Sequence, residues 1–245
     1  MLVAAAVCPC PPLLVPEVAA GAAAEMDRAR AACYDAVAVL AAARPDRLLL
    51  VGPAEPAERG GYPAGSRGSL HGFGVALDVT LGAGAPDPGE PGSGEPGARP
   101  LPPSLTVGAW LLERTGWRAA PVAALALSDQ DGPADCLATG RELAAEDGRL
   151  ALLVLGDGSA CRTEKAPGAF DDRAAPFDRA AAEALAGADV RALADLDPVL
   201  ARQLHVAGRP GWQLLAGAAE GADLAGRLLH DEAPYGVGYL VATWS

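Results

Sequence analysis

The residues best able to take part in chemistry lie in a polar loop, Gly156 to Arg162 (GDGSACR). This loop directly follows a strongly apolar run. Asp157 is a candidate catalytic residue, because a carboxylate in such a loop can bind or polarise a small ligand. Ser159, Arg162 and Lys165 are candidate binding residues, since a cationic pair would attract an anionic group and is unusual in a chain of formal net charge -12. The alternative is that Asp157 accepts backbone N–H bonds in its glycine turn and simply holds the loop.

A second candidate catalytic residue is Cys10, in the segment Cys8 to Pro12 (CPCPP). A thiol becomes a good nucleophile when its pKa is lowered, here by a helix beginning near Pro16 or by Arg162 across a cleft. Cys10 could instead be inert packing, or form a soft-metal site with Cys8 if other thiols lay nearby. The chain has five cysteines, an odd number without zinc spacing, which favours free thiols in the cytoplasm.

The three histidines, His71, His205 and His230, have no metal-ligand spacing to one another. We expect surface or capping roles for them, with a rebuilt iron site as the alternative. The Gly156 loop also differs in spacing from the G-x-S-x-G motif of serine hydrolases, and no histidine follows at a suitable place.

Alternating strands and helices must position these loops. Buried apolar runs predict parallel strands, and the segments between them predict helices, which together give a three-layer α/β/α fold with a mostly parallel central sheet. The predicted strands are 2–7, 47–52, 75–81, 120–128, 149–160 (running into the polar loop) and 236–244. The predicted helices are 18–43, 104–115, 134–145, 176–186, 190–194, 198–204 and 210–219.

We expect residues 1–245 to form a single domain, with residues 82–103 as a flexible Gly/Pro-rich acidic loop inserted within it. Ligands of open parallel sheets bind beyond the carboxyl ends of the strands. Three loops leave such ends: Cys8 to Pro12, Gly52 to Arg59, and Gly156 to Arg162. We therefore expect them to meet at one site.

Charge and hydropathy limit the kinds of partner that the protein can bind. The net charge of -12 argues against nucleic acid and against an anionic membrane. No apolar run is long enough to span a bilayer, and Pro11-Pro12 cuts the opening run too short for a signal peptide, so a cytoplasmic protein is expected. Lys165 is the only lysine, against eighteen arginines, which indicates a bacterium with a GC-rich genome.

Four segments, in order, resemble the class III extradiol dioxygenase B-subunit family (the LigB-like fold, shared with Memo proteins). CPCPPLLVPE is similar to that family's opening His-Pro-Pro segment, and LLLVGPAEP to its strand ending in Ser-Pro-His. VLGDGSA is similar to its Ser-Gly-Asp-Leu-Ser-His motif. The stretch from FDRAAAEAL to VAGRPGWQLL resembles its helical region ending in Cys-Gly or Glu-Gly followed by Arg.

The resemblance implies a LigB-like fold and Fe(II) held by two histidines and a carboxylate (a cysteine in Memo proteins), with a further histidine for acid/base work. The family's ligand positions fall on Cys10, Ala54 and Ala207, and its acid/base position falls on Ala160. Alanine neither binds a metal nor moves a proton. The resemblance thus implies a scaffold that lacks the usual metal ligands.

Three functions follow as expectations. The leading one is a non-dioxygenase protein without a cofactor, which binds a small molecule or another protein and forms a homodimer as relatives commonly do. The second is an enzyme that reuses the same cleft through Cys10, Asp157 and Arg162. The third is an active Fe(II) ring-cleaving dioxygenase with its ligands elsewhere in the chain.

Overall fold

Seven strands form one sheet in the computed structural model, which describes residues 1–82 and 99–245. Two further short strands, β4 (Arg67–Ser69) and β5 (Asp78–Thr80), pair with each other beside it. In their order across the large sheet, the strands are β3 (Gly60–Tyr62), β6 (Val122–Leu127), β2 (Arg47–Pro53), β7 (Leu150–Leu155), β1 (Leu2–Cys8), β9 (Tyr239–Trp244) and β8 (Gly226–Glu232).

The four central strands, β6, β2, β7 and β1, run parallel to one another. At the two edges, β3 pairs antiparallel with β6, while β9 and β8 continue antiparallel from β1. The parallel strands are rich in Leu, Val and Ala, and every residue of β7 is buried. Both faces of the sheet are therefore covered, as parallel sheets require.

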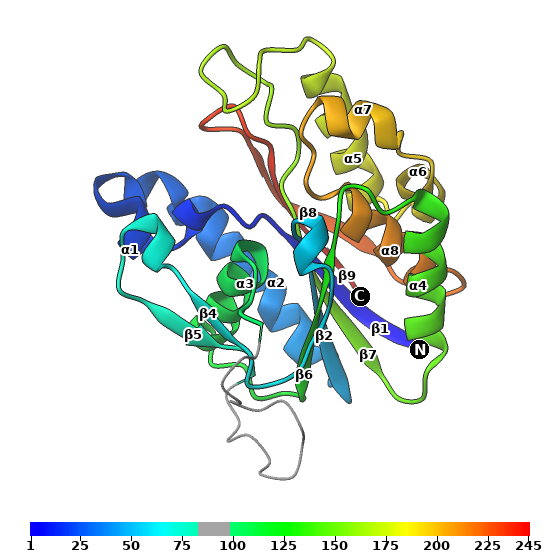
Figure 1. Cartoon of the computed structure of the whole chain (residues 1–245). Coiled ribbons are helices and arrows are strands. Elements are labelled where there is room, and N and C mark those ends of the chain that lie inside the picture. Colours follow the sequence, from blue (N-terminus) through cyan, green and yellow to red (C-terminus); the bar gives the residue numbers. More distant parts are fainter. Residues whose placement is uncertain (83–98) are drawn as a thin grey trace.

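Helices cover both faces of the sheet and make three layers (Figure 1). The helices are α1 (Pro16–Ala19), α2 (Asp27–Ala42), α3 (Pro103–Arg114), α4 (Pro133–Ala145), α5 (Ala174–Ala186), α6 (Val190–Ala194), α7 (Pro198–Gln203) and α8 (Arg209–Ala219). One core lies between the sheet and α2 with α3, and the other between the sheet and α4 to α8. The predicted three-layer α/β/α fold is confirmed.

The predicted helix 18–43 is too long at its start. The chain turns out of α1 at Ala20, where φ is +48°, and continues as a 3-10 segment, Ala20–Met26, before α2 begins at Asp27. The alanine-rich sequence favours a helix throughout, and Gly21, directly after Ala20, is the one residue that weakens a helix at this break. Strand β8, with the sequence GRLLHDE, was not predicted, because only its pairing with β9 makes it a strand.

Most of the predicted flexible loop 82–103 lies outside the described residues. Its last part is ordered: the backbone N–H of Leu101 donates to the carbonyl of Arg67 at 2.8 Å, and α3 already begins at Pro103. The predicted strand 75–81 shortens to β5. Over the described ranges, no helix is long and apolar enough to cross a membrane.

Helices α4 and α8 pack closely because each has a glycine at their contact. A methyl group at Gly140 would overlap the backbone of Leu214 and Ala218, and one at Gly217 would overlap the backbone of Leu137. Alanine at either position would therefore force the helices apart. Since α8 begins with the residues that reach the carboxyl edge of the sheet, this contact also sets the position of that edge.

We predict that Gly140→Ala lowers the free energy of unfolding by about 3 kcal/mol, because the added methyl group has only rigid backbone to displace. Urea unfolding followed by circular dichroism measures the change. Gly61→Ala is the control, since a methyl group there meets no atom within 4 Å. Equal stability of the two variants would contradict this account of the packing.

Candidate functional site

A cleft with a volume of about 560 Å³ opens at the carboxyl ends of the central strands. Its walls come from the loops after β1, β2 and β6, from the start of α3, and from the segment just before α8. The lining residues are Cys10, Pro53, Ala54, Glu55, Glu58, Pro103, Ser104, Asp129 and Ala207. The three positions to which the family resemblance assigned metal ligands, Cys10, Ala54 and Ala207, thus lie around one hollow.

The loop after β7 is bonded to two walls of this cleft through Asp157, which does not itself line it. Its carboxylate oxygen Oδ1 accepts the backbone N–H of Cys10 at 2.8 Å, and its carbonyl accepts the N–H of Gly208 at 2.9 Å. A methyl group at Gly156 would overlap Gly208, so the two loops touch backbone to backbone. Asp157 therefore does hold the structure together, but it links three separate loops rather than its own turn.

Burial raises the pKa of Asp157 to about 7, and the hydrogen bond from the Cys10 N–H opposes this shift. Burial also raises the pKa of the Cys10 thiol well above its usual value, and the nearby charge of Asp157 and the Cys33 thiol add to the effect. A raised pKa leaves little thiolate at neutral pH. The electrostatics thus work against Cys10 as a nucleophile and favour Asp157 as a group that titrates near pH 7.

The other predicted binding residues of this loop do not line the cleft. Ser159 is fully buried, and both its N–H and its hydroxyl donate to the carboxylate of Asp178, at 2.7 and 2.8 Å. Arg162 forms an ion pair with the same carboxylate at 3.5 Å, so it does not face Cys10. Lys165 lies exposed. Arg162 and Ser159 therefore fasten the loop to α5.

The family acid/base position, Ala160, also lies outside the lining, and its N–H donates to the carbonyl of Leu204 at 2.9 Å. The three histidines sit on separate elements. His71 is exposed near Asp78, His205 follows the end of α7 with a φ of +54°, and His230 is buried in β8, where burial lowers its pKa. None of the three lines the cleft.

The residues present do not fit the iron centre that the resemblance implies. A two-histidine, one-carboxylate site needs three donor side chains at the three positions, whereas Ala54 and Ala207 carry no donor atom and Cys10 offers a protonated thiol. Over residues 1–82 and 99–245, no three His, Cys, Asp or Glu side chains are grouped so that they could hold a metal ion.

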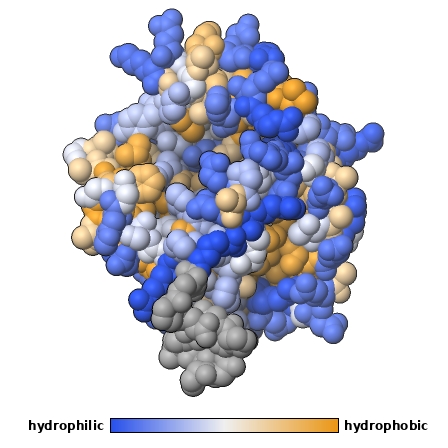
Figure 2. All heavy atoms as spheres, viewed as in Figure 1, coloured by the Kyte–Doolittle hydropathy of each residue, from blue (hydrophilic) through white to orange (hydrophobic). Residues whose placement is uncertain are grey.

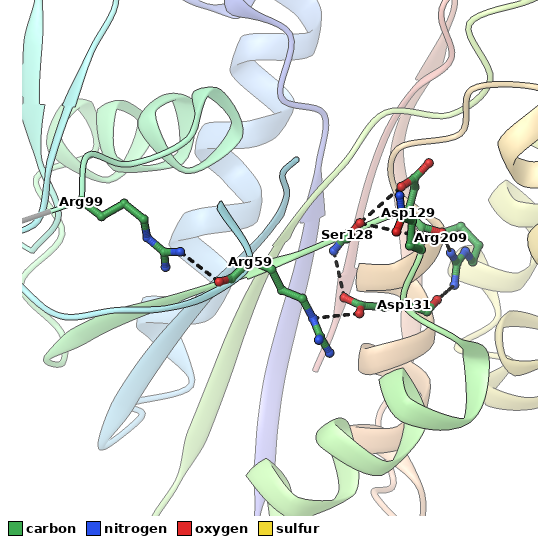
Figure 3. Close-up of polar contacts among 7 residues, drawn as sticks. Arg59, Arg99, Ser128, Asp129, Asp131 and Arg209 are labelled. Atoms are coloured by element: carbon green, nitrogen blue, oxygen red, sulfur yellow. Dashed lines mark hydrogen bonds and ion pairs between the residues drawn. The ribbon is translucent and has the colours of Figure 1, made fainter. Parts of the chain in front are cut away.

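The sequence analysis did not include the loop after β6 among the expected site loops. This loop also leaves the carboxyl end of a buried strand, so the rule for parallel sheets applied to it as well. Ser128, Asp129 and Asp131 follow a buried strand at the same edge of the sheet as the three predicted loops (Figure 3). The Asp131 carboxylate accepts the N–H of Ser128 at 2.9 Å and pairs with Arg59 at 2.8 Å, which ties this loop to the loop after β2. Asp129 lines the cleft.

Arg209, the first residue of α8, holds the same loop from inside the protein. Its side chain is 1% exposed and donates to the carbonyls of Asp129 and Asp131 and to the side chain of Gln213 (Figure 3). Desolvation lowers the pKa of the guanidinium. A buried cation bonded to two carbonyls of one loop fixes that loop firmly, and with it the cleft wall.

The cleft combines an apolar floor with an acidic rim. Ala54, Ala207 and two prolines supply the apolar surface, and the carboxylates of Glu55, Glu58 and Asp129 supply the charge. No Arg, Lys or His is among the lining residues. Elsewhere on the face seen in Figure 2, hydrophilic residues cover most of the surface, with small apolar areas between them.

The fold defines the chain as a three-layer α/β/α protein with a mostly parallel sheet, and one solved structure shows the same arrangement. It is described as the uncharacterized protein JW3007 from Escherichia coli K12, and it matches with a TM-score of 0.54 and 15% sequence identity over 99% of this chain and 100% of that chain. At this identity the likeness shows the fold alone. No protein-family model matches the chain, and no curated protein matches it.

We predict that Arg209→Met lowers the free energy of unfolding by about 2–4 kcal/mol, because it leaves two buried carbonyl groups without a donor. Urea unfolding measures this loss. Arg141→Met is the control, since Arg141 pairs with Glu220 on the exposed side of the α4 and α8 contact, and its unfolding midpoint should stay near that of the wild type. An equally stable Arg209→Met protein would refute the anchoring role.

Asp157 should make stability depend on pH. In the native protein it holds its proton up to about pH 7, whereas an unfolded aspartate releases it near pH 4, so the native state binds more protons between these values. The free energy of unfolding contributed by this group is therefore largest at low pH and falls as the pH rises from about 4 to about 7.

The measurement is urea unfolding of the wild type and of Asp157→Asn at several pH values from 4.5 to 8.5. Relative to the wild type, Asp157→Asn should gain stability as the pH rises to about 7 and level off above it. Asp223→Asn, which removes an exposed carboxylate outside the cleft, is the control and should follow the wild-type profile. Parallel profiles for Asp157→Asn and the wild type would show that Asp157 titrates as it does in the unfolded chain.

Proposed function

We propose that the protein is a LigB-like relative of the extradiol dioxygenases that has no dioxygenase activity and binds a small organic molecule in its cleft. One observation carries the proposal. Cys10, Ala54 and Ala207, at which the related family would place its metal ligands, line one cleft of about 560 Å³, and two of the three have no donor atom. The inherited position of a site is thus retained while its metal chemistry is not.

The character of the cleft supports a small molecule as the ligand. Small-molecule sites are concave, largely apolar, and contain a few polar groups that fix orientation. Here Pro53, Ala54 and Ala207 provide the apolar surface. The hydroxyl of Ser104 donates to the carbonyl of Pro53 and so stiffens the wall where α3 meets the loop after β2. A cleft of this volume accommodates a molecule with one or two rings.

The position of the cleft supports the same function. Open parallel sheets bind ligands beyond the carboxyl ends of their strands, and all four parallel strands end at this cleft or beside it. Its walls are held by Asp157 on one side and by Arg209 on the other. A site that is rigid before binding loses little entropy when a ligand enters.

The proposal is tested by ligand-observed NMR with a library of small aromatic and heterocyclic fragments, using protein purified without added metal. We expect several fragments to bind the wild type and to lose binding in Ala54→Trp, because the indole ring would fill the cleft. Ala180→Trp adds the same ring on the exposed face of α5 and should retain binding. Binding that survives in Ala54→Trp would place the ligands elsewhere on the protein.

A second experiment tests whether the protein cleaves aromatic rings. The wild type, incubated with Fe(II) and catechol, should consume no more oxygen than the iron alone, because no three donor side chains of the described residues are grouped so that they could hold the ion. Stoichiometric iron uptake with catechol-dependent oxygen consumption would instead establish an active dioxygenase, and the proposed function would be wrong.

A further inference from the structure

The carboxylates that line the cleft have no counter-ions of their own. Glu55, Glu58 and Asp129 all line it, and within residues 1–82 and 99–245 none of the three takes part in an ion pair. Like charges held around one hollow repel one another, and a cation that enters relieves this repulsion. The charge of the lining therefore bears directly on what the cleft binds.

The register of the sheet brings Glu55 and Asp129 to the same wall. Pro53 of β2 pairs with Leu127 of the parallel strand β6, and the N–H of Ala54 donates to the carbonyl of Leu127 at 2.8 Å. Glu55 and Asp129 each come two residues after this pair. Neighbouring strands lie about 4.8 Å apart, so the two acidic residues leave adjacent strand ends at the same level.

Both loops that carry these carboxylates are fixed before any ligand enters. In the loop after β2, the N–H of Glu55 donates to the carboxylate of Glu58 at 3.3 Å, and a reciprocal capping bond closes the turn. Arg99 donates to the carbonyl of Arg59 at 3.0 Å and holds the far end of the same loop (Figure 3). Arg209 anchors the loop after β6. The acidic wall is thus preorganised.

The two nearest cations do not neutralise this wall. Arg59 points to Asp131 and pairs with it at 2.8 Å, while Arg209 donates to backbone carbonyls of the loop after β6 (Figure 3). Neither arginine is among the residues that line the cleft. The cleft therefore keeps a negative charge.

A buried hydroxyl at the cleft also lacks a donor. Ser104 is 5% exposed and lines the cleft, and its hydroxyl donates to the carbonyl of Pro53. Because its proton is committed, the oxygen can only accept a further hydrogen bond, and no group in the described part of the chain donates to it. Gly52 leaves room for this oxygen, since a methyl group there would lie 2.8 Å from it. Ser104 thus adds an acceptor to the acidic lining.

The thiol of Cys10 is a second buried side chain that faces the cleft without a partner. Cys10 is 7% exposed and lines the cleft, yet its sulfur takes part in no hydrogen bond among residues 1–82 and 99–245. Burial raises the pKa of this thiol well above its usual value, so it stays neutral. A neutral, polarisable sulfur packs well against an aromatic or aliphatic group. Together with the alanines and prolines of the lining, it forms a surface for the apolar part of a ligand.

These acceptors suit an organic cation better than a metal ion. Over the described ranges, no three His, Cys, Asp or Glu side chains are grouped so that they could hold a metal ion. A molecule that carries several N–H groups can instead reach acceptors that lie apart on different loops. The cleft volume of about 560 Å³ leaves space for its apolar part.

We infer that the cleft binds an organic cation with N–H donors, an amine or an amidine, attached to an apolar body. This inference rests on the proposed function and names the ligand class of the same cleft. The N–H groups bond to the carboxylates of Glu55 and Asp129 and to the oxygen of Ser104, and the apolar body lies against Cys10. Hydrogen bonds between charged partners are about twice as strong as neutral ones, so a cation is favoured over a neutral molecule of the same shape, and an anion is repelled.

The test compares three probes of one shape, benzamidine, benzamide and benzoate, by NMR titration of the whole chain. We expect benzamidine to bind about tenfold more tightly than benzamide, and benzoate to bind least. Phenyltrimethylammonium has the charge but no N–H group, and should bind less tightly than benzamidine. Added salt should weaken benzamidine and leave benzamide unchanged, because screening acts on the charge alone.

Variants of the lining show where the cation binds. Glu55→Gln and Asp129→Asn should each weaken benzamidine about threefold, and together about tenfold, with benzamide unchanged. Glu142→Gln and Asp223→Asn are the matched controls, since each removes one exposed carboxylate outside the cleft, and both should bind benzamidine as the wild type does.

The outcomes separate this inference from the proposed function. If the three probes bind equally and all lose binding in Ala54→Trp, the cleft binds small molecules but the cation assignment is wrong. If benzamidine binding survives in Ala54→Trp, or Glu55→Gln and Asp129→Asn match their controls, the cation binds elsewhere and the inference is wrong. If phenyltrimethylammonium binds as tightly as benzamidine, the role of the N–H donors is wrong. If no probe and no fragment binds, both proposals are wrong.

Discussion

The site depends on the contact between the strand ends of β1 and β7. The N–H of Gly156 donates to the carbonyl of Cys8 at 3.0 Å, and Asp157 then accepts the N–H of Cys10 at 2.8 Å. These two hydrogen bonds hold the two loops together where the pairing of β1 with β7 ends. The backbone of Gly208 packs directly against Gly156 at the same point. Without them, the segments that form the cleft would have no fixed relation to one another.

Arg209, which is buried, and Asp157, which is half-buried, serve this arrangement in different ways. Arg209 satisfies carbonyl groups of the loop after β6 and also donates to the side chain of Gln213 within α8, so it fixes Asp129 at the cleft. Asp157 uses one oxygen for the fold and leaves the other available.

Sequence patterns were sufficient for the central strands and for most helices, because β1, β2, β6 and β7 are short apolar runs with clear ends. The rule for parallel sheets also brought the loops of Cys10 and Ala54 to one edge, whereas Ala207 was placed there only by the family resemblance. Sequence patterns did not reveal that the loop after β7 is bridged to the start of β9, since the bridge joins the backbones of Gly158 and Gly238, which lie far apart in the sequence. Nor did they show that Arg162 would be paired with Asp178, a partner sixteen residues away on α5.

Alanine at positions 54 and 207 has two effects that cannot be separated. A methyl group supplies no lone pair, and it also occupies far less room than an imidazole or a carboxylate. Under the proposed relationship to the extradiol dioxygenases, each alanine that replaces a ligand would also add empty space at the same point. Such a chain would gain room for a larger ligand through the same changes that remove its metal ligands, without any insertion in the backbone.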